Sequence, residues 1–182
     1  MLVRRGMSLV EVMVYCLLLA LFSAIAFVSL PGRATRTTQE LQDATSQASL
    51  ALTRLVGELD NSLANTVTSD ERSIYFLSAT PEKGRLRYDS EGELLWQGWV
   101  AYVYDKPTLT RYWLPLASES VKSGVGKTPS LDQIRSGSSR VVARGVTYFS
   151  ITRESTSFWV FQARVEVGAA FHRLRTGGGP RR

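Results

Sequence analysis

The N-terminal part of the chain is strongly apolar. Between residues 7 and 30 the only charged side chain is Glu11. As a helix with a rise of about 1.5 Å per residue, this stretch would be long enough to cross a hydrocarbon layer of about 30 Å. Pro31 and Gly32 follow directly. Because proline removes a backbone donor and clashes with the preceding turn, they predict a break or kink.

A second helical pattern follows, with apolar residues three or four positions apart. They are Leu41, Ala44, Ala48, Leu52, Leu55, Leu59 and Leu63. This spacing places them on one face of a helix, and most of the polar residues between them fall elsewhere. The sequence therefore predicts an amphipathic helix over residues 31–66, whose apolar face is suited to covering a sheet.

Beyond residue 70 the chain has short segments rich in β-branched and aromatic residues, which is typical of strands. These segments are residues 73–77, 86–88, 94–104, 109–116, 141–151 and 158–167. Turn-forming residues separate them, notably at 89–92 and 104–107. The predicted fold class is α+β: a long N-terminal helix, with a transmembrane half and an amphipathic half, packed on an antiparallel β-sheet.

The composition of the 182-residue chain argues against catalysis. Its only cysteine, Cys16, excludes an intrachain disulfide, and we expect it to act as a small buried apolar residue. The only histidine, His172, makes a histidine-based triad or a histidine-rich metal site improbable. The Gly-Lys-Thr sequence at 126–128 resembles the end of a phosphate-binding loop, but Val121 stands where the opening glycine belongs. The sequence predicts no enzyme, no metal site and no cofactor.

A short basic leader that ends in glycine precedes the apolar stretch, and a glutamate follows five positions after that glycine. The residues are Arg4-Arg5-Gly6-Met7-Ser8-Leu9-Val10-Glu11. They resemble the class III signal of type IV pilins and type II secretion pseudopilins. The resemblance implies that a prepilin peptidase cuts between Gly6 and Met7 and methylates the new N-terminus at Met7. It also implies that Glu11 pairs with the N-terminal amine of a neighbouring subunit. Met7 is a departure, because the family most often has phenylalanine there.

The late predicted strands are similar to those of larger minor subunits, the J-type pseudopilins and W-type minor pilins. The implied parts are a leader peptide at 1–6, a transmembrane assembly helix at 7–30, an amphipathic helix at 31–66, a periplasmic β-rich domain at 67–172 and a flexible basic tail at 173–182. The implied function is that of a structural minor subunit near the tip of a type II secretion pseudopilus or a type IV pilus. The implied location is the inner membrane, with a cytoplasmic N-terminus. The implied partners are prepilin peptidase, other major and minor subunits, and secreted protein cargo. A minor pilin of a DNA-uptake pilus is the alternative.

An ordinary secretory signal peptide is a second interpretation of the N-terminus. The basic start, the apolar run and the small residues Ala24 and Ala26 meet its description. Glu11 argues against it, because a charge at the head of the apolar region opposes insertion. Under this alternative the mature protein is a soluble periplasmic binding domain that begins near Phe27.

Charge is distributed unevenly along the chain. Residues 135–182 contain nine arginines against Glu154 and Glu166, whereas residues 60–99 contain seven acidic and four basic residues. Such faces suit contacts between neighbouring subunits. Clustered arginine also attracts phosphate, so nucleic acid or an anionic envelope is a further candidate partner. No nucleic-acid-binding motif accompanies the cluster, which weakens that interpretation.

Overall fold

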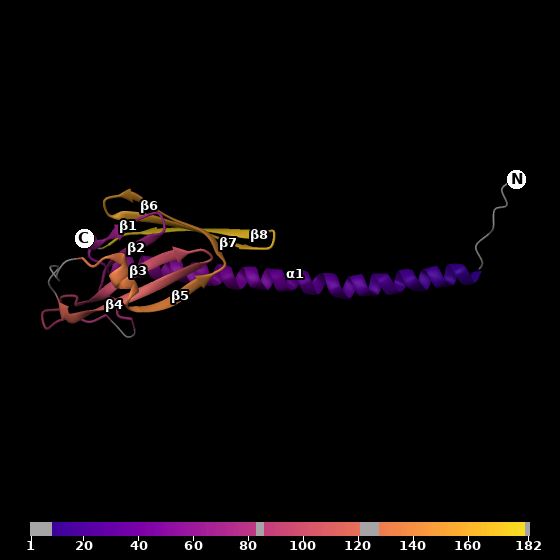
Figure 1. Ribbon diagram of the computed structural model, residues 1–182, viewed down its shortest axis with the longest axis horizontal. Helices are drawn as coiled ribbons and strands as arrows, with labels where there is room; N and C mark the ends of the chain where they lie inside the picture. The colour runs from indigo at the N-terminus through magenta and orange to yellow at the C-terminus, as the bar shows by residue number, and fades with distance from the viewer. Residues whose placement is uncertain (1–8, 83–85, 121–127, 181–182) are drawn as a thin grey trace. The chain divides into compact units, whose positions relative to one another are not determined.

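The computed structural model describes residues 9–82, 86–120 and 128–180. The chain divides into two units, residues 1–40 and residues 41–182. Helix α1 (Leu9–Asp60) begins in the first unit and ends in the second. The other elements all belong to the second unit (Figure 1). They are η1 (Ala64–Thr66), β1 (Thr68–Ser69), β2 (Ser73–Ser78), β3 (Trp96–Asp105), β4 (Thr108–Ser120), α2 (Leu131–Arg135), β5 (Ser138–Arg144), β6 (Val146–Ser155), β7 (Phe158–Val167) and β8 (Ala170–Gly178).

The strands form two antiparallel sheets. One has five strands in the order β1-β2-β3-β4-β5, and the other has three in the order β6-β7-β8. Within each sheet, every strand pairs with the next strand along the chain. The β3–β4 turn is closed by the pair Asp105 and Thr108, and the β7–β8 turn by Val167 and Ala170. Because such tight turns bring neighbouring segments together at little entropic cost, the local sequence pattern largely determines the pairing.

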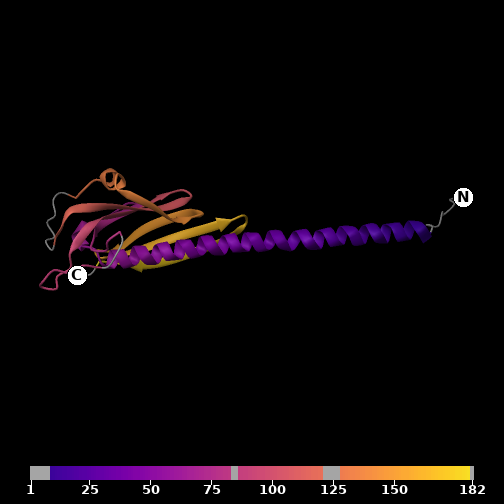
Figure 2. The same cartoon turned by 90° about the horizontal axis from the view of Figure 1, so that it is seen from below.

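The main core of the second unit combines the last turns of α1 with residues from both sheets. On the helix, Ala48, Leu52, Leu55 and Leu59 are only 0–3% exposed. The sheets contribute large buried side chains to the same cluster, including Ile74, Phe76, Tyr102, Trp159, Phe161 and Val165. Figure 2 shows the strands on one side of these turns of α1. The helix is therefore buried along one stripe, at the spacing of three and four residues seen in the sequence.

A second, smaller core forms around α2. The helix begins with a capping box: the Ser130 hydroxyl accepts from the backbone N–H of Gln133, and the Gln133 side chain accepts from the backbone N–H of Ser130. Ile134 of α2 is fully buried, and it belongs to the same cluster as Trp99 of β3. The residues of β3 contribute alternately to the two cores. This explains the uninterrupted burial of residues 97–104.

The fold class predicted from the sequence is wrong. The predicted fold contains one sheet, whereas the described strands form two separate sheets. The prediction also includes a helix whose first half crosses a membrane. The part of the chain that the structure describes contains no helix long and apolar enough to do so. No break occurs at Pro31 and Gly32, since α1 runs without interruption from Leu9 to Asp60.

Gly145 explains why there are two sheets. The single strand predicted over residues 141–151 is divided here, with β5 ending at Arg144 and β6 beginning at Val146 in the other sheet. Gly145 has a φ of +72°, which residues with a Cβ rarely adopt. One residue in this conformation redirects the chain without interrupting the apolar pattern around it. The pattern therefore suggests one strand where the backbone makes two.

The flexible tail predicted over residues 173–182 is a strand for most of its described length. β8 pairs with β7 along its whole extent, from Ala170 opposite Val167 to Gly178 opposite Trp159. Gly178 also lies against α1, since a Cβ at this position would stand 2.6 Å from Cγ1 of Val56. The glycines that suggest a flexible linker in the sequence instead permit close packing.

We expect Gly178→Ala to lower the free energy of unfolding by about 1–3 kcal/mol, because the added methyl group overlaps the stiff Val56 side chain. Gly57→Ala is the matched control. It lies on α1, and its added Cβ would have no atom within 4 Å, so we expect a gain of about 0.5–1 kcal/mol. Urea unfolding of the full chain in a nonionic detergent, followed by tryptophan fluorescence, measures both. Equal stability of the two variants would contradict the close contact at Gly178.

Candidate functional site

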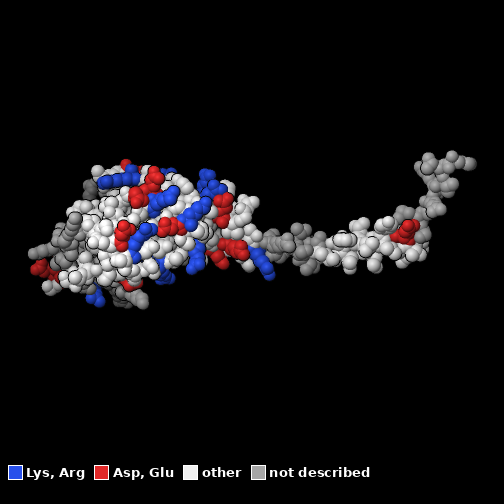
Figure 3. All heavy atoms as spheres, in the orientation of Figure 1, with Lys and Arg blue, Asp and Glu red and all other residues white. Residues whose placement is uncertain are grey.

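The first candidate site is the apolar N-terminal part of α1. Its exposed large side chains are Leu9, Val10, Val12, Met13, Val14, Tyr15, Leu17, Leu18, Leu19, Leu21, Phe22 and Ile25, each between 43% and 80% exposed. Successive residues rotate by about 100° around a helix, so these side chains cover every face. In Figure 3 this part of the helix is white except for acidic atoms near its beginning. Such a surface normally marks a contact with lipid or with another protein.

Glu11 is the charged exception within residues 9–25, and it lies in the first turn of α1. The backbone N–H groups of a first turn carry partial positive charge, which stabilises a carboxylate. The two predicted processing residues, Gly6 and Met7, lie outside the described residues. Cys16 is exposed on this segment, so the burial predicted for it does not occur within the chain itself.

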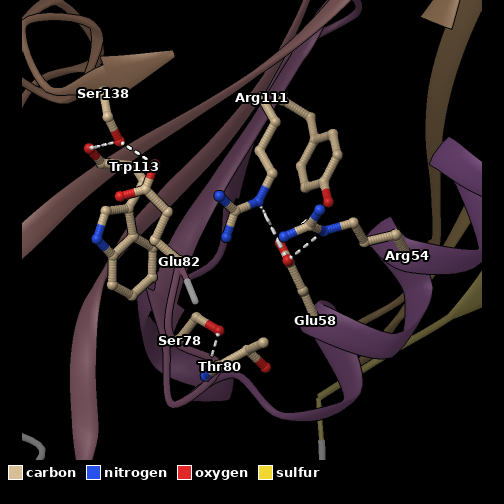
Figure 4. A network of polar contacts seen from close by, with 9 residues as sticks. Arg54, Glu58, Ser78, Thr80, Glu82, Arg111, Trp113 and Ser138 are labelled. Carbon is tan, nitrogen blue, oxygen red and sulfur yellow. Dashed lines mark hydrogen bonds and ion pairs between the residues drawn. The ribbon is translucent and has the colours of Figure 1, made fainter. Parts of the chain in front are cut away.

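The second candidate is a buried polar cluster between the last turns of α1 and strands β3 and β4 (Figure 4). Glu58 of α1 is 2% exposed and Arg111 of β4 is 4% exposed. The Nε of Arg111 donates to both carboxylate oxygens of Glu58, at 3.1 Å and 3.0 Å. The Tyr102 hydroxyl donates to the same carboxylate at 3.0 Å, and the Nε of Arg54 donates at 2.9 Å.

The hydrogen bonding of this cluster fits a structural role. Each carboxylate oxygen of Glu58 accepts two hydrogen bonds, which leaves little capacity to take a proton from a substrate. Burial, and then the negative charge of Glu58, raise the pKa of Tyr102 well above its ordinary value. The Tyr102 hydroxyl therefore stays protonated and acts as a donor. The cluster joins α1 to both strands through one shared carboxylate.

Two depressions lie beside the three-stranded sheet. The larger, about 860 Å³, lies at the β3–β4 turn and β6, and the charged side chains Glu71, Arg72, Asp105 and Lys106 line it in equal numbers of each sign. The smaller, about 530 Å³, crosses β6, β7 and β8 and is lined by basic and neutral residues. Among the described residues, no three His, Cys, Asp or Glu side chains are grouped to hold a metal ion.

Reasoning from the sequence finds Glu11 but misses the pair of Glu58 and Arg111. A signal was present, because Glu58 lies between Leu55 and Leu59 on the buried stripe of α1, where a carboxylate needs a partner. The partner comes from β4, 53 positions further along the chain. No local spacing connects the two residues, so only the fold identifies the pair.

Comparisons with known proteins identify no similar protein. A scan against protein-family models, a search of curated proteins and a search of solved structures each find no match for this chain.

We expect Glu58→Ala to lower the free energy of unfolding by about 3–5 kcal/mol, because it leaves the buried guanidinium of Arg111 without its counter-ion. Arg54→Ala is the matched control within the same cluster. Its side chain is 35% exposed and bonds to Glu58 four positions along the helix, so its loss should cost less than about 1 kcal/mol. Urea unfolding measures both. Similar losses for the two variants would show that the buried pair has no special role.

Proposed function

We propose that this chain is a structural minor subunit of the pilin and pseudopilin class. Prepilin peptidase cuts it between Gly6 and Met7, and it then joins a type II secretion pseudopilus or a type IV pilus near the tip. The observation that supports this most strongly is the apolar surface on all sides of residues 9–25. It lies directly after the leader motif, where a subunit of this class makes its contacts with other subunits.

The energetics of that surface favour an apolar environment. Taking a dozen large apolar side chains that are about half to four-fifths exposed out of water would contribute on the order of 10–20 kcal/mol. Before assembly, lipid of the inner membrane would cover these side chains, and in a fibre neighbouring subunits would cover them. Because lipid is as apolar as a neighbouring helix, association then depends on side-chain packing and polar contacts. The partners are therefore the peptidase, the inner membrane and other subunits, with secreted protein as the cargo.

Glu11 gives this assembly its specificity in our proposal. A carboxylate enclosed by apolar side chains is costly unless a cation reaches it. Cleavage after Gly6 creates a new positive charge, the amine of Met7, at the same end of the helix. Pairing between Glu11 of one subunit and the Met7 amine of the next would bring opposite charges together between subunits, and it would fix how far neighbouring helices are offset.

The first test is the N-terminal sequence and intact mass of the protein recovered from a host that has a prepilin peptidase. We expect a chain that begins at methylated Met7, and we expect Gly6→Ala to abolish that product and leave the precursor. Gly57→Ala, a glycine remote from the leader, is the control and should mature normally. A wild-type chain that begins near Phe27 would instead show a domain released by signal peptidase and would overturn the proposal.

The second test addresses Glu11. We expect Glu11→Ala to be cleaved normally but recovered at least about tenfold less in sheared fibres, because the neighbouring amine loses its counter-ion. Glu40→Ala removes an exposed carboxylate elsewhere on α1 and should assemble like the wild type. Normal recovery of Glu11→Ala would show that the carboxylate is dispensable for assembly.

A further inference from the structure

The smaller depression on the three-stranded sheet has a composition that the proposed function does not explain. We call it the arginine depression. It is lined by Tyr148, Gln162, Ala163, Arg164, Arg173, Leu174 and Arg175. These residues come from β6, β7 and β8, the three strands that run together in Figure 1. Its volume of about 530 Å³ is within the range of sites for small molecules.

Strand register places like charges directly opposite one another in the arginine depression. Arg164 of β7 is the partner of Arg173 of β8, and Tyr148 of β6 is the partner of Arg164 on its other side. In the neighbouring row, Gln162 is the partner of Arg175. Like charges at directly opposed positions destabilise a sheet. The protein therefore maintains an unfavourable arrangement at this point.

Acidic neighbours balance only part of this charge. Arg164 contacts Glu166 at 3.4 Å, and Arg175 contacts Glu154 at 3.2 Å, in pairs whose side chains are at least one-third exposed. Neither glutamate lines the depression, and within the described residues no ion pair involves Arg173. Positive charge therefore remains in excess where Arg164 and Arg173 meet.

Phe171 holds the two opposed guanidinium groups. The Cζ atoms of Arg164 and Arg173 lie 4.5 Å and 5.6 Å from the centre of its ring. Cation–π contacts at these distances restrict the guanidinium planes while leaving N–H groups available. Both arginines line the depression, and both are thereby held against the same ring before any ligand arrives.

We propose that the arginine depression binds the phosphate group of a small soluble ligand. Its polar side chains supply donors: three guanidinium groups, the Gln162 amide and the Tyr148 hydroxyl. Guanidinium groups match the oxygens of a phosphate with paired hydrogen bonds. A doubly charged oxyanion between Arg164 and Arg173 would also remove their repulsion. All the lining residues come from a single sheet of the second unit, so α1 contributes no side chain to this site.

The test uses the full chain in a nonionic detergent, with radiolabelled pyrophosphate as the probe in equilibrium dialysis. We expect saturable binding that unlabelled inorganic phosphate displaces. Arg173→Gln should weaken binding at least about tenfold, as expected when a hydrogen bond to a charged group is lost. Arg173→Lys keeps the positive charge but loses the paired N–H donors of the guanidinium group. Its affinity should therefore lie between that of the wild type and that of Arg173→Gln. Arg140→Gln, an exposed arginine on β5, should bind within about twofold of the wild type.

Two further readouts separate this proposal from a structural role and from a lipid contact. Without ligand, Arg173→Gln should be at least as stable as the wild type, because it removes a like-charge pair. With pyrophosphate at one fixed concentration, the wild type and Arg140→Gln should gain the most thermal stability, Arg173→Lys less and Arg173→Gln the least. The proposal is overturned if wild-type binding does not saturate, if Arg173→Gln binds as tightly as the wild type, or if the Arg173-dependent contact occurs only with phosphatidylglycerol vesicles.

Discussion

The carboxylate of Glu58 is the point on which the second unit depends, because it joins elements that are far apart in the sequence. It accepts hydrogen bonds from Arg111 on β4 and from Tyr102 on β3. Moving a carboxylate and a guanidinium out of water costs several kcal/mol each, and Nη2 of Arg111 remains buried without a partner. An apolar contact would avoid that cost. The pair therefore contributes mainly to specificity: a helix that slid or rotated relative to β3 and β4 would leave two buried charges unpaired.

A close backbone contact then limits where α1 can lie against the other sheet. Because Gly178 at the end of β8 has no Cβ, the Val56 side chain of α1 can pack directly against its backbone. Because β8 pairs with β7 along its whole length, this contact also fixes the three-stranded sheet against the helix. The helix is thus held by a directional ion pair on one sheet and by a tight steric fit on the other. Gly145 makes this possible, since it lets a continuous chain leave the first sheet and enter the second.

The sequence predicts well the features that depend on near neighbours. The segment 158–167 is the strand β7 as predicted, and the predicted turn at 89–92 forms with Gly92 at a φ of +84°. Prediction from the sequence fails where one residue type occurs in two kinds of structure. Glycines near the C-terminus are typical of flexible linkers, but they also permit close packing. Together with the neighbouring arginines, they predict a flexible tail where strand β8 lies. The partner of Glu58 is likewise beyond local reasoning, because its identity depends on how α1 packs against strands β3 and β4.

The two parts of the chain differ in what they leave unsatisfied. The second unit buries a core of large apolar side chains and pairs the carboxylate of Glu58 within it. The described start of α1 is the reverse, because its apolar side chains remain exposed on every face. Contact with lipid or with another molecule would remove these side chains from water. The side chains that form the core and those that remain exposed therefore lie in different parts of the chain.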